Sequence, residues 1–441
     1  MNEKKSKKAI YETTIDSFSH EGRGVARVEG KTTFIQGALE GEKVLYELTF
    51  RKKDFDQANV VDILEPAGNR VAPKCEHYQY CGGCSLQHLS HDGQIAFKQW
   101  MFSDTLARFG HVTPEAWVEP IVGPAWSYRH KARLSVRHVH KKGGVLVGFR
   151  EKRQPKYITD IEQCRILAPS VGDNIVKFKQ LLDQFDNLDT IAQIEVAVGD
   201  DETALILRNL APLTDNEQRL LMSFANENHY RIFLQPGNYE TVSLFYPKDD
   251  KDYLQYHLSR YNITFDFHPT DFTQINPVIN EQMIDQAIEW LALNDHDVVL
   301  DLFCGLGNFS LPLALKAKQV IGIEGSESMV ERANHNRLRN HIENAQFFAA
   351  DLSKENALVE LIKLPIDKAL IDPPRTGALE IVKQLSKLNI NRIVYVSCNP
   401  ATLARDADYL VNQAGYRLVK AGIMDMFPQT SHVESMAVFE R

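Results

Sequence analysis

The stretch VVLDLFCGLGNF, residues 298–309, decides the fold class of this chain. Its apolar first half is typical of a buried strand, and Gly305 and Gly307 then form a turn before a helix-like stretch. Glycines at the carboxyl end of a strand allow the backbone to approach a ligand closely. The stretch lacks the third glycine of the dinucleotide fingerprint, so by itself it does not predict NAD.

Four further strand-like runs follow this stretch, and the segments between them are long enough for crossover helices. The runs are residues 320–324, 346–350, 368–371 and 392–396. Alternating strands and helices predict a doubly wound (Rossmann-like) α/β sheet. We expect this α/β domain to occupy residues 271–441.

Acidic side chains close successive strands of the predicted sheet. Glu324 ends the second strand, Asp351 follows the third and Asp372 follows the fourth. A carboxylate at the position of Glu324 is placed to accept hydrogen bonds from both hydroxyls of a ribose. Any one of these residues alone also fits a helix cap or a solvated loop. Together, around one glycine turn, they fit a nucleoside-type cofactor such as S-adenosylmethionine.

Two short motifs follow the fourth and fifth strands. Asp372-Pro-Pro-Arg375 forms a rigid loop of the kind with which methyltransferases engage a planar amine or a base edge. Cys398 lies at the end of the fifth strand, beside the predicted cofactor crevice, where a nucleophile would be placed. A lone cysteine in an apolar strand is usually a small core residue. The flanking Ser, Asn and Pro show that the strand has ended here, which favours a functional role.

A reactive cysteine beside a methyl donor indicates a specific reaction. The C5 carbon of uracil is a poor nucleophile, but a thiolate that adds to C6 converts C5 into an enolate-like carbon that can attack a sulfonium methyl. The methylated adduct must then lose its C5 proton to a general base before the thiol leaves. Glu434, just before the strand-like run 435–439, is our candidate base, with His432 as a weaker one.

The first 270 residues have a different character. Short strand-like runs cut by glycines predict a small OB-like β-barrel over residues 1–68, which either binds oligonucleotides or serves only as a packing module. These runs are residues 10–18, 22–28, 32–35 and 43–50. A helix-like segment at 92–109 then leads into a β-rich region, and we expect a central domain over residues 69–270.

The net charge of −8 is unevenly distributed. Between Tyr128 and Lys156 ten positive residues stand against one acid, Glu151, so this basic window carries +9 and the rest of the chain −17. An acidic protein with one concentrated basic stretch is suited to a polyanionic partner. Such a run is also typical of an ordinary solvated surface.

Six cysteines are too few for a disulfide scaffold. Cys75, Cys81 and Cys84 are close in sequence, and with the distant Cys164 they supply the four thiolates of a tetrahedral site. Spacing alone does not separate zinc from an iron–sulfur cluster. We interpret Cys304 as a packing residue of the glycine turn.

Over nearly its whole length the sequence resembles the RNA 5-methyluridine methyltransferases. The matching motifs are DFTQIN at 271–276, the turn at 301–308, DPPR at 372–375, SCNP at 397–400 and HVE at 432–434. The resemblance implies a TRAM-like N-terminal barrel, Cys398 as nucleophile and Glu434 as base. It also implies that S-adenosylmethionine is contacted by Gln274, Phe303, Asn308, Glu324, Asp351 and Asp372.

The resemblance further implies a [4Fe-4S] cluster on Cys75, Cys81, Cys84 and Cys164, with zinc as the alternative. Its role would be structural or RNA-positioning, because methyl transfer requires no electron. We expect RNA contacts from Arg129, Lys131 and Arg133 of the basic window, and from Phe272.

We therefore expect methylation of C5 of a uracil in 23S ribosomal RNA, at a flipped-out or loop position because paired bases are inaccessible. The alternatives are another rRNA site or tRNA, an amine methyltransferase of the Asp-Pro-Pro type, and a non-catalytic iron–sulfur RNA-binding protein or redox sensor. No apolar run reaches the roughly 18 residues of a membrane span. No apolar segment of a secretory signal follows the lysines of residues 1–8, so we expect a cytoplasmic protein without an obligate protein partner.

Overall fold

The computed structural model describes residues 9–249, 251–354, 357–358, 365–388 and 390–441, which excludes the lysine-rich residues 1–8. The chain forms two compact units. The first, here called the N-terminal unit, consists of Met1–Gln79, Gly83–Met101 and Phe427–His432. The second, the C-terminal unit, consists of Tyr80–Gly82, Phe102–Met426 and Val433–Arg441.

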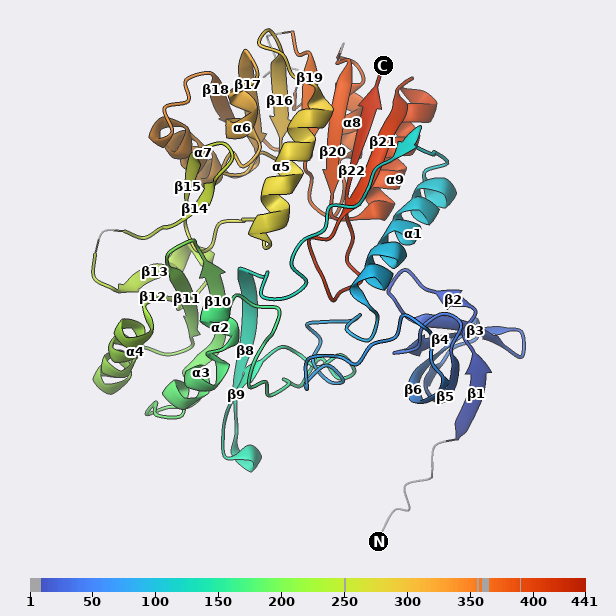
Figure 1. The fold of residues 1–441 in the computed structure, drawn as a ribbon. Coiled ribbons are helices and arrows are strands. Elements are labelled where there is room, and N and C mark those ends of the chain that lie inside the picture. Colours follow the sequence, from blue (N-terminus) through green and yellow to red (C-terminus); the bar gives the residue numbers. More distant parts are fainter. Residues whose placement is uncertain (1–8, 250, 355–356, 359–364, 389) are drawn as a thin grey trace. The chain divides into compact units, whose positions relative to one another are not determined.

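A six-stranded sheet of order β1-β5-β6-β4-β3-β2 forms the barrel of the N-terminal unit (Figure 1). Its strands are β1 (Ile10–Thr14), β2 (Ser17–Phe18), β3 (Gly24–Val28), β4 (Lys31–Gln36), β5 (Lys43–Arg51) and β6 (Phe55–Glu65). Alternate apolar side chains, including Ala26, Ile35 and Val44, point inward and are buried. The four predicted runs are confirmed as β1 to β5. β6, the longest strand, was not predicted, because polar residues such as Asp56 and Asn59 interrupt its apolar alternation.

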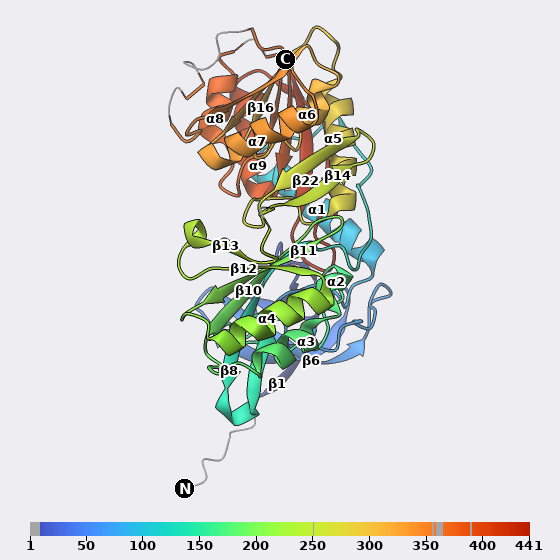
Figure 2. The same cartoon turned by 90° about the vertical axis from the view of Figure 1, so that its left-hand side faces the viewer.

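The C-terminal unit contains a central six-stranded sheet of order β13-β12-β11-β10-β8-β9. Its strands are β8 (Lys131–Val139), β9 (Gly144–Gly148), β10 (Ile191–Val198), β11 (Thr203–Asn209), β12 (Tyr230–Leu234) and β13 (Ser243–Tyr246). Two helices that the sequence analysis did not predict, α3 (Ile175–Leu182) and α4 (Asp215–Asn228), pack against this sheet (Figure 2). Thr214 and Glu217 form a capping box at the start of α4, which fixes where that helix begins.

The second sheet of this unit has eight strands in the order β18-β17-β16-β19-β20-β22-β21-β7. Its strands are β7 (Ala116–Trp117), β16 (Val298–Leu302), β17 (Gln319–Glu324), β18 (Ala345–Ala349), β19 (Lys368–Ile371), β20 (Arg392–Ser397), β21 (Arg417–Met424) and β22 (Glu434–Glu440). The five predicted strands are confirmed as the parallel strands β16 to β20. β21 was not predicted, and Glu434 is the first residue of β22 instead of preceding it.

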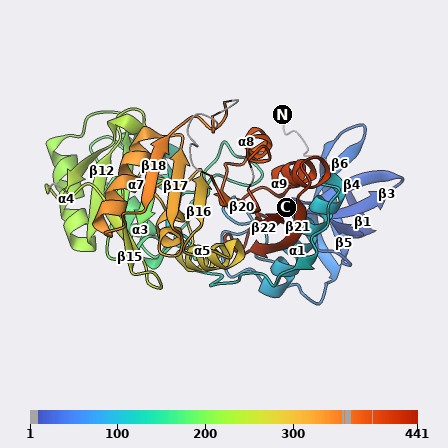
Figure 3. The ribbon, with the colours of Figure 1, turned by 90° about the horizontal axis from the view of Figure 1, so that it is seen from above.

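Helices cover both faces of this eight-stranded sheet, as the doubly wound prediction requires: α5 lies on one face, and α8 and α9 on the other (Figure 3). The helices are α5 (Pro277–Leu291), α6 (Ser310–Ala314), α7 (Glu327–Arg339), α8 (Leu379–Leu385) and α9 (Pro400–Asp408). The strand order reverses between β16 and β19. Ligands of open α/β sheets bind at the carboxyl ends of the strands beside such a reversal.

Three smaller features complete the description. The strands β14 (Leu254–Leu258) and β15 (Ile263–Phe267) form a hairpin that packs against α7. The remaining helices are α1 (His91–Phe109), which was predicted, and the short α2 (Pro169–Gly172). Among the described residues, no helix is both long enough and apolar enough to span a membrane.

Candidate active site

The register of the last two central strands brings Cys398 and Glu434 together. β20 and β22 are antiparallel, Ser397 pairs with Ser435, and the Ser435 hydroxyl donates to the Ser397 carbonyl over 3.3 Å. Cys398 directly follows the one serine and Glu434 directly precedes the other. The two residues therefore stand at the same end of one ladder, although they are far apart in sequence.

Burial dominates the electrostatics of this pair. It raises the pKa of the Cys398 thiol to about 11, with the charges of Glu434 and Asp372 acting in the same direction and Arg375 opposing them. Burial also raises the pKa of Glu434 well above its ordinary value, with Asp372 adding to the shift. The pKa of Asp372 rises to about 7 for the same reason. Arg375 is thus the positive group that favours the ionised forms of both Cys398 and Glu434.

The loop that carries Arg375 is fixed beside Cys398 by α9 and its N-cap. The Arg375 carbonyl accepts a hydrogen bond from Asn399 Nδ2 over 2.9 Å and another from the Thr402 hydroxyl over 3.4 Å. At the other end of the loop, Ala378 N–H donates to the buried carboxylate of Asp406 over 2.8 Å. The Asp-Pro-Pro-Arg motif is therefore held by the residues that follow Cys398 in sequence.

The glycine turn after β16 leaves open space for a ligand. A Cβ atom at Gly305, where φ is +55°, would meet only the Met329 methyl at 3.6 Å. Phe303 also has a positive φ, +63°, which is strained for a bulky side chain. Glu324 supports the turn, because one of its oxygens accepts from Gly305 N–H over 3.1 Å and the other from Gly325 N–H over 2.8 Å.

Asp301 is a site residue that the sequence analysis did not single out. It is fully buried in β16, and the Ser310 hydroxyl donates to one of its carboxylate oxygens. The other oxygen, Oδ1, makes no hydrogen bond to any described residue. Burial raises the pKa of Asp301 to about 7, and Asp372 and Glu324 add to that shift. The signal in the sequence was a carboxylate inside an apolar strand, directly before the glycine turn.

The other residues predicted to contact the cofactor differ in their burial and in the hydrogen bonds that they form within the protein. Asn308 exchanges two hydrogen bonds with Asn280, over 3.1 and 2.8 Å, and accepts a third from the Tyr256 hydroxyl over 2.9 Å. Gln274 is half-buried in the segment between β15 and α5. Asp351 is exposed, and the hydrogen bonds it accepts from Ser353 lower its pKa.

The predicted RNA-contacting residues of the basic window have partners within the protein. Lys131 is partly buried, burial lowers its pKa to about 8, and its ammonium group donates to the Asp271 carbonyl. Arg129 Nε donates to the Lys131 carbonyl over 2.9 Å. Arg133 is exposed, but it forms an ion pair with Glu195 over 3.2 Å. The three residues chosen for RNA contact are thus already engaged by the protein.

The four clustered cysteines are divided between the units, with Cys75 and Cys84 in the N-terminal unit and Cys81 and Cys164 in the C-terminal unit. Cys81 and Cys84 are buried, whereas Cys75 and Cys164 are partly exposed. Within the described residues of either unit alone, no three His, Cys, Asp or Glu side chains are grouped as a metal site requires. Cys304 is buried in the glycine turn, in agreement with a packing role. His432, the weaker base candidate, is exposed, with its ring against Phe427.

Comparison with known proteins shows the family. The family model for tRNA (uracil-5-)-methyltransferase matches residues 248–441, and the TRAM domain model matches residues 5–55. The 23S rRNA (uracil(1939)-C(5))-methyltransferase RlmD of Legionella pneumophila (strain Corby) is 54% identical over 427 residues, which cover 97% of this chain and 96% of the relative. The chain belongs to the RlmD family of RNA uracil-C5 methyltransferases.

Other relatives agree with this assignment to the RlmD family. The RlmD protein of Alcanivorax borkumensis is 47% identical over 428 residues, or 97% of this chain. Among solved structures, the tRNA (uracil-54, C5)-methyltransferase of Pyrococcus abyssi, in complex with S-adenosyl-L-homocysteine, covers 97% of this chain and all of its own, with a TM-score of 0.73 and 22% identity. That likeness confirms the fold of the RlmD-family chain, including the doubly wound methyltransferase sheet.

Proposed function

We propose that this chain transfers a methyl group from S-adenosylmethionine to C5 of a uracil in 23S ribosomal RNA, through a covalent adduct between Cys398 and uracil C6. The proposal rests on the position of Cys398 and Glu434 at the same end of the β20–β22 ladder. The reaction needs a nucleophile and a general base beside the same uracil ring. The whole-length relatives are named for uracil 1939 of 23S rRNA, which favours this substrate over tRNA.

Two observations fit S-adenosylmethionine. The space in front of Gly305 is open, and the buried Oδ1 of Asp301 is an acceptor without a partner among the described residues. The residues that would hold the cofactor are Gln274, Phe303, Asn308, Glu324, Asp351 and Asp372. When bound, it supplies an electrophilic methyl group on a sulfonium.

The site residues divide the reaction between them. Cys398 must lose its proton before it can add to C6, and Arg375 stabilises the thiolate that results. Addition to C6 makes C5 nucleophilic. After methyl transfer the Glu434 carboxylate accepts the C5 proton. It must be ionised for this step, a form that Arg375 favours, and a carboxylate of higher pKa is then a stronger base. Loss of that proton lets the Cys398 thiolate leave and restores the uracil ring.

A tritium-release assay tests the proposal. RNA that carries tritium at uracil C5 should lose it to water as C5 is methylated, and Cys398→Ala should release none. An amine methyltransferase or a non-catalytic RNA-binding protein would release no tritium either. Mapping of ribosomal RNA from cells that lack the protein then identifies the uracil. Loss of methylation at a tRNA position instead, with 23S rRNA unchanged, would contradict the choice of substrate.

We also propose that Cys75, Cys81, Cys84 and Cys164 hold a [4Fe-4S] cluster, with zinc as the alternative metal. The donor set supports this, because four cysteines supply four thiolates, and thiolates suit both metals. Protein purified without oxygen should be brown with about four irons per chain, and each Cys→Ser change should reduce that content. Colourless protein with stoichiometric zinc would contradict the cluster. A role in ribosomal RNA modification supports a cytoplasmic location.

A further inference from the structure

The segment between β15 and α5, residues 271–276, exposes an aromatic side chain. Phe272 is 70% exposed, although the residues on both sides of it are at least partly buried. Single-stranded RNA is commonly held by stacking of its bases on aromatic side chains. An aromatic side chain binds a base more tightly when its backbone is already fixed, because ordering a mobile segment on binding costs free energy. The contacts of Asp271, the residue before Phe272, show how that backbone is fixed.

From the central sheet, two backbone-directed contacts hold the segment. Lys131, the first residue of β8, donates from its ammonium group to the Asp271 carbonyl. His130 N–H donates to the Ile275 carbonyl over 2.8 Å. These contacts lie on either side of Phe272 and Gln274 in the sequence, so the segment is bonded at both ends to the start of β8 and the residue before it. The ammonium group of the partly buried Lys131 is thus already bonded to this segment.

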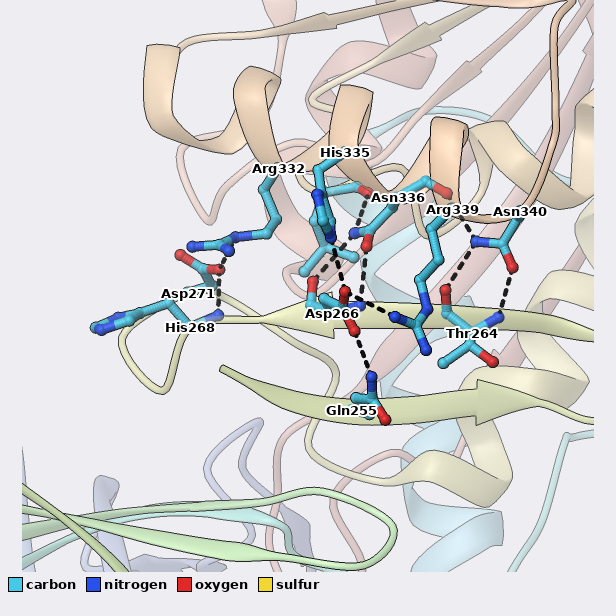
Figure 4. Close-up of polar contacts among 11 residues, drawn as sticks. Gln255, Thr264, Asp266, His268, Asp271, Arg332, His335, Asn336, Arg339 and Asn340 are labelled. Atoms are coloured by element: carbon cyan, nitrogen blue, oxygen red, sulfur yellow. Dashed lines mark hydrogen bonds and ion pairs between the residues drawn. The ribbon is translucent and has the colours of Figure 1, made fainter. Parts of the chain in front are cut away.

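α7 contributes an ion pair to the Asp271 side chain. Arg332 Nε lies 3.3 Å from Asp271 Oδ2, and the Arg332 side chain is only 25% exposed. The same carboxylate oxygen accepts from His268 N–H over 2.7 Å, which closes the turn after β15. Figure 4 shows Arg332 extending from the helix to Asp271, away from the other contacts of α7. Asp271 is thus held through its carbonyl by Lys131 and through its carboxylate by Arg332.

The helix that supplies Arg332 is itself tied to the cofactor turn. The fully buried Asn336 accepts from Asp266 N–H over 2.8 Å and donates to the Asp266 carbonyl over 3.1 Å, which clamps α7 to β15 (Figure 4). The same Asn336 amide also donates to the Leu306 carbonyl, in the glycine turn, over 3.4 Å. The segment 271–276 is therefore placed relative to the residues proposed to hold the methyl donor.

We propose that Arg332 and Lys131 are positioning residues: Arg332 pairs with the Asp271 carboxylate and Lys131 binds the Asp271 carbonyl. They thereby fix the backbone beside Phe272, so that its ring can stack on an unpaired base of the substrate RNA. The proposal rests on the function proposed above. It assigns to Lys131 a role that its place in a basic window concealed, and it gives Arg332 a role that no sequence motif indicated.

A double-mutant cycle tests the proposal with an RNA oligonucleotide that the wild-type protein methylates. Phe272→Ala and Arg332→Ala should each weaken RNA binding on the order of tenfold, the effect of about one lost base stack. When Phe272 is already Ala, adding Arg332→Ala should weaken RNA binding by less than about twofold, because the effects of residues that act through one contact are not additive. An equal loss in both backgrounds would show that Arg332 does not act through Phe272, and would overturn the proposal.

Arg339→Ala is the matched control. Arg339 lies on the same helix and pairs with Asp266 on the same hairpin, over 3.2 Å, without contacting Asp271. Its effect on RNA binding should be the same with and without Phe272. Affinity for S-adenosylhomocysteine shows whether each variant is folded. Arg332→Lys keeps the charge and should bind RNA more tightly than Arg332→Ala. This variant still tests the proposal if Arg332→Ala does not fold. A folded Arg332→Lys with none of the RNA affinity restored would count against the proposal.

The salt dependence of RNA binding shows whether Lys131 positions Asp271 or contacts an RNA phosphate. Lys131→Met should weaken binding and leave the slope of log affinity against log salt unchanged. A phosphate contact would instead flatten the slope by about 0.7, which would overturn the positioning role of Lys131. Failure of the wild-type protein to methylate RNA would refute the proposed function, whereas additive losses in a protein that does methylate refute only this inference.

Discussion

Two regions were predicted from simple sequence patterns: the strand ends of the eight-stranded sheet and the basic window. The patterns indicated which residues meet at the strand ends, but they did not indicate the partners of the charged residues in the basic window. At the strand ends, Glu324, Asp372 and Cys398 converge because parallel strands of one sheet end at a common edge. In the basic window, Lys131 contacts Asp271, which is 140 residues away in the sequence. The function of a strand-end residue follows from local topology, whereas the partner of a charged side chain is decided by distant contacts.

Cys398→Ala gives the largest expected effect on the strand-end side of this comparison. Removal of the nucleophile should abolish methylation and formation of an adduct with 5-fluorouracil RNA, because no other described thiol stands at the Cys398–Glu434 ladder end. Methyl transfer and adduct formation are measured in parallel. The control Cys304→Ala removes a buried thiol from the glycine turn and should retain both. Loss of the adduct in the Cys304 variant alone would show that the nucleophile lies in the glycine turn and not at the end of β20.

The pH dependence of adduct formation is the next largest effect. The thiol pKa of about 11 means that the thiolate fraction of the free protein rises about tenfold for each pH unit below that value. With ionised Cys398 limiting, adduct formation should accelerate roughly 100-fold between pH 7 and pH 9. Single-turnover rates with 5-fluorouracil RNA measure this. Replacement of Arg375 by Met should slow the reaction at neutral pH, and Arg375→Lys should slow it less. A rate that is flat above pH 7 would show that the thiol already ionises at neutral pH.

Asp301 predicts a pH dependence of folding stability. Its pKa is about 7 in the folded protein and near 3.8 when unfolded, so the folded state binds the extra proton and stability falls as pH rises through this range. Between pH 5.5 and pH 8 this loss amounts to about 2 kcal/mol. Asp301→Asn, which retains an oxygen for the Ser310 hydroxyl, should remove that part of the dependence. Urea unfolding at the two pH values measures it, and an Asn variant with the wild-type dependence would contradict the origin assigned here.

The smallest effect concerns the basic window. Joint replacement of Arg129, Lys131 and Arg133 by Ala would flatten the salt slope of RNA binding by about 2 if all three met phosphates. Because only Arg133 of these three is exposed, we expect a change of at most about 0.7. Arg153 and Lys156 are both exposed, and their joint replacement should flatten the slope by about 1.4. If the triple replacement flattens the slope more than the Arg153 and Lys156 pair does, phosphate contacts by Arg129, Lys131 and Arg133 are supported instead.

Much of the fold could be predicted because apolar runs and intervening helices mark β16 to β20 directly. The chemistry of Cys398 and Glu434 suggested that they lie close together, but the sequence did not show how, since their proximity depends on β22 inserting antiparallel between β20 and β21. β21 itself has the polar residues Arg417 and Lys420 in its first half, so the periodic signal was weak. The contact between Lys131 and Asp271 could not be predicted, because a sequence does not show which lysine of a basic run will bind a distant segment.

The central claim is that Cys398 and Glu434 act at opposite ends of one covalent cycle, and a trapped adduct tests it most directly. Glu434→Gln keeps the nucleophile but cannot accept the C5 proton, so unmodified RNA and S-adenosylmethionine should give a protein–RNA band that survives denaturing electrophoresis. Mass spectrometry of that band should find a methylated uracil on Cys398, and the double variant with Cys398→Ala should give no band. If Glu434→Gln instead turns over at the wild-type rate and no adduct accumulates, Glu434 is not the base and the shared ladder end is not the catalytic centre.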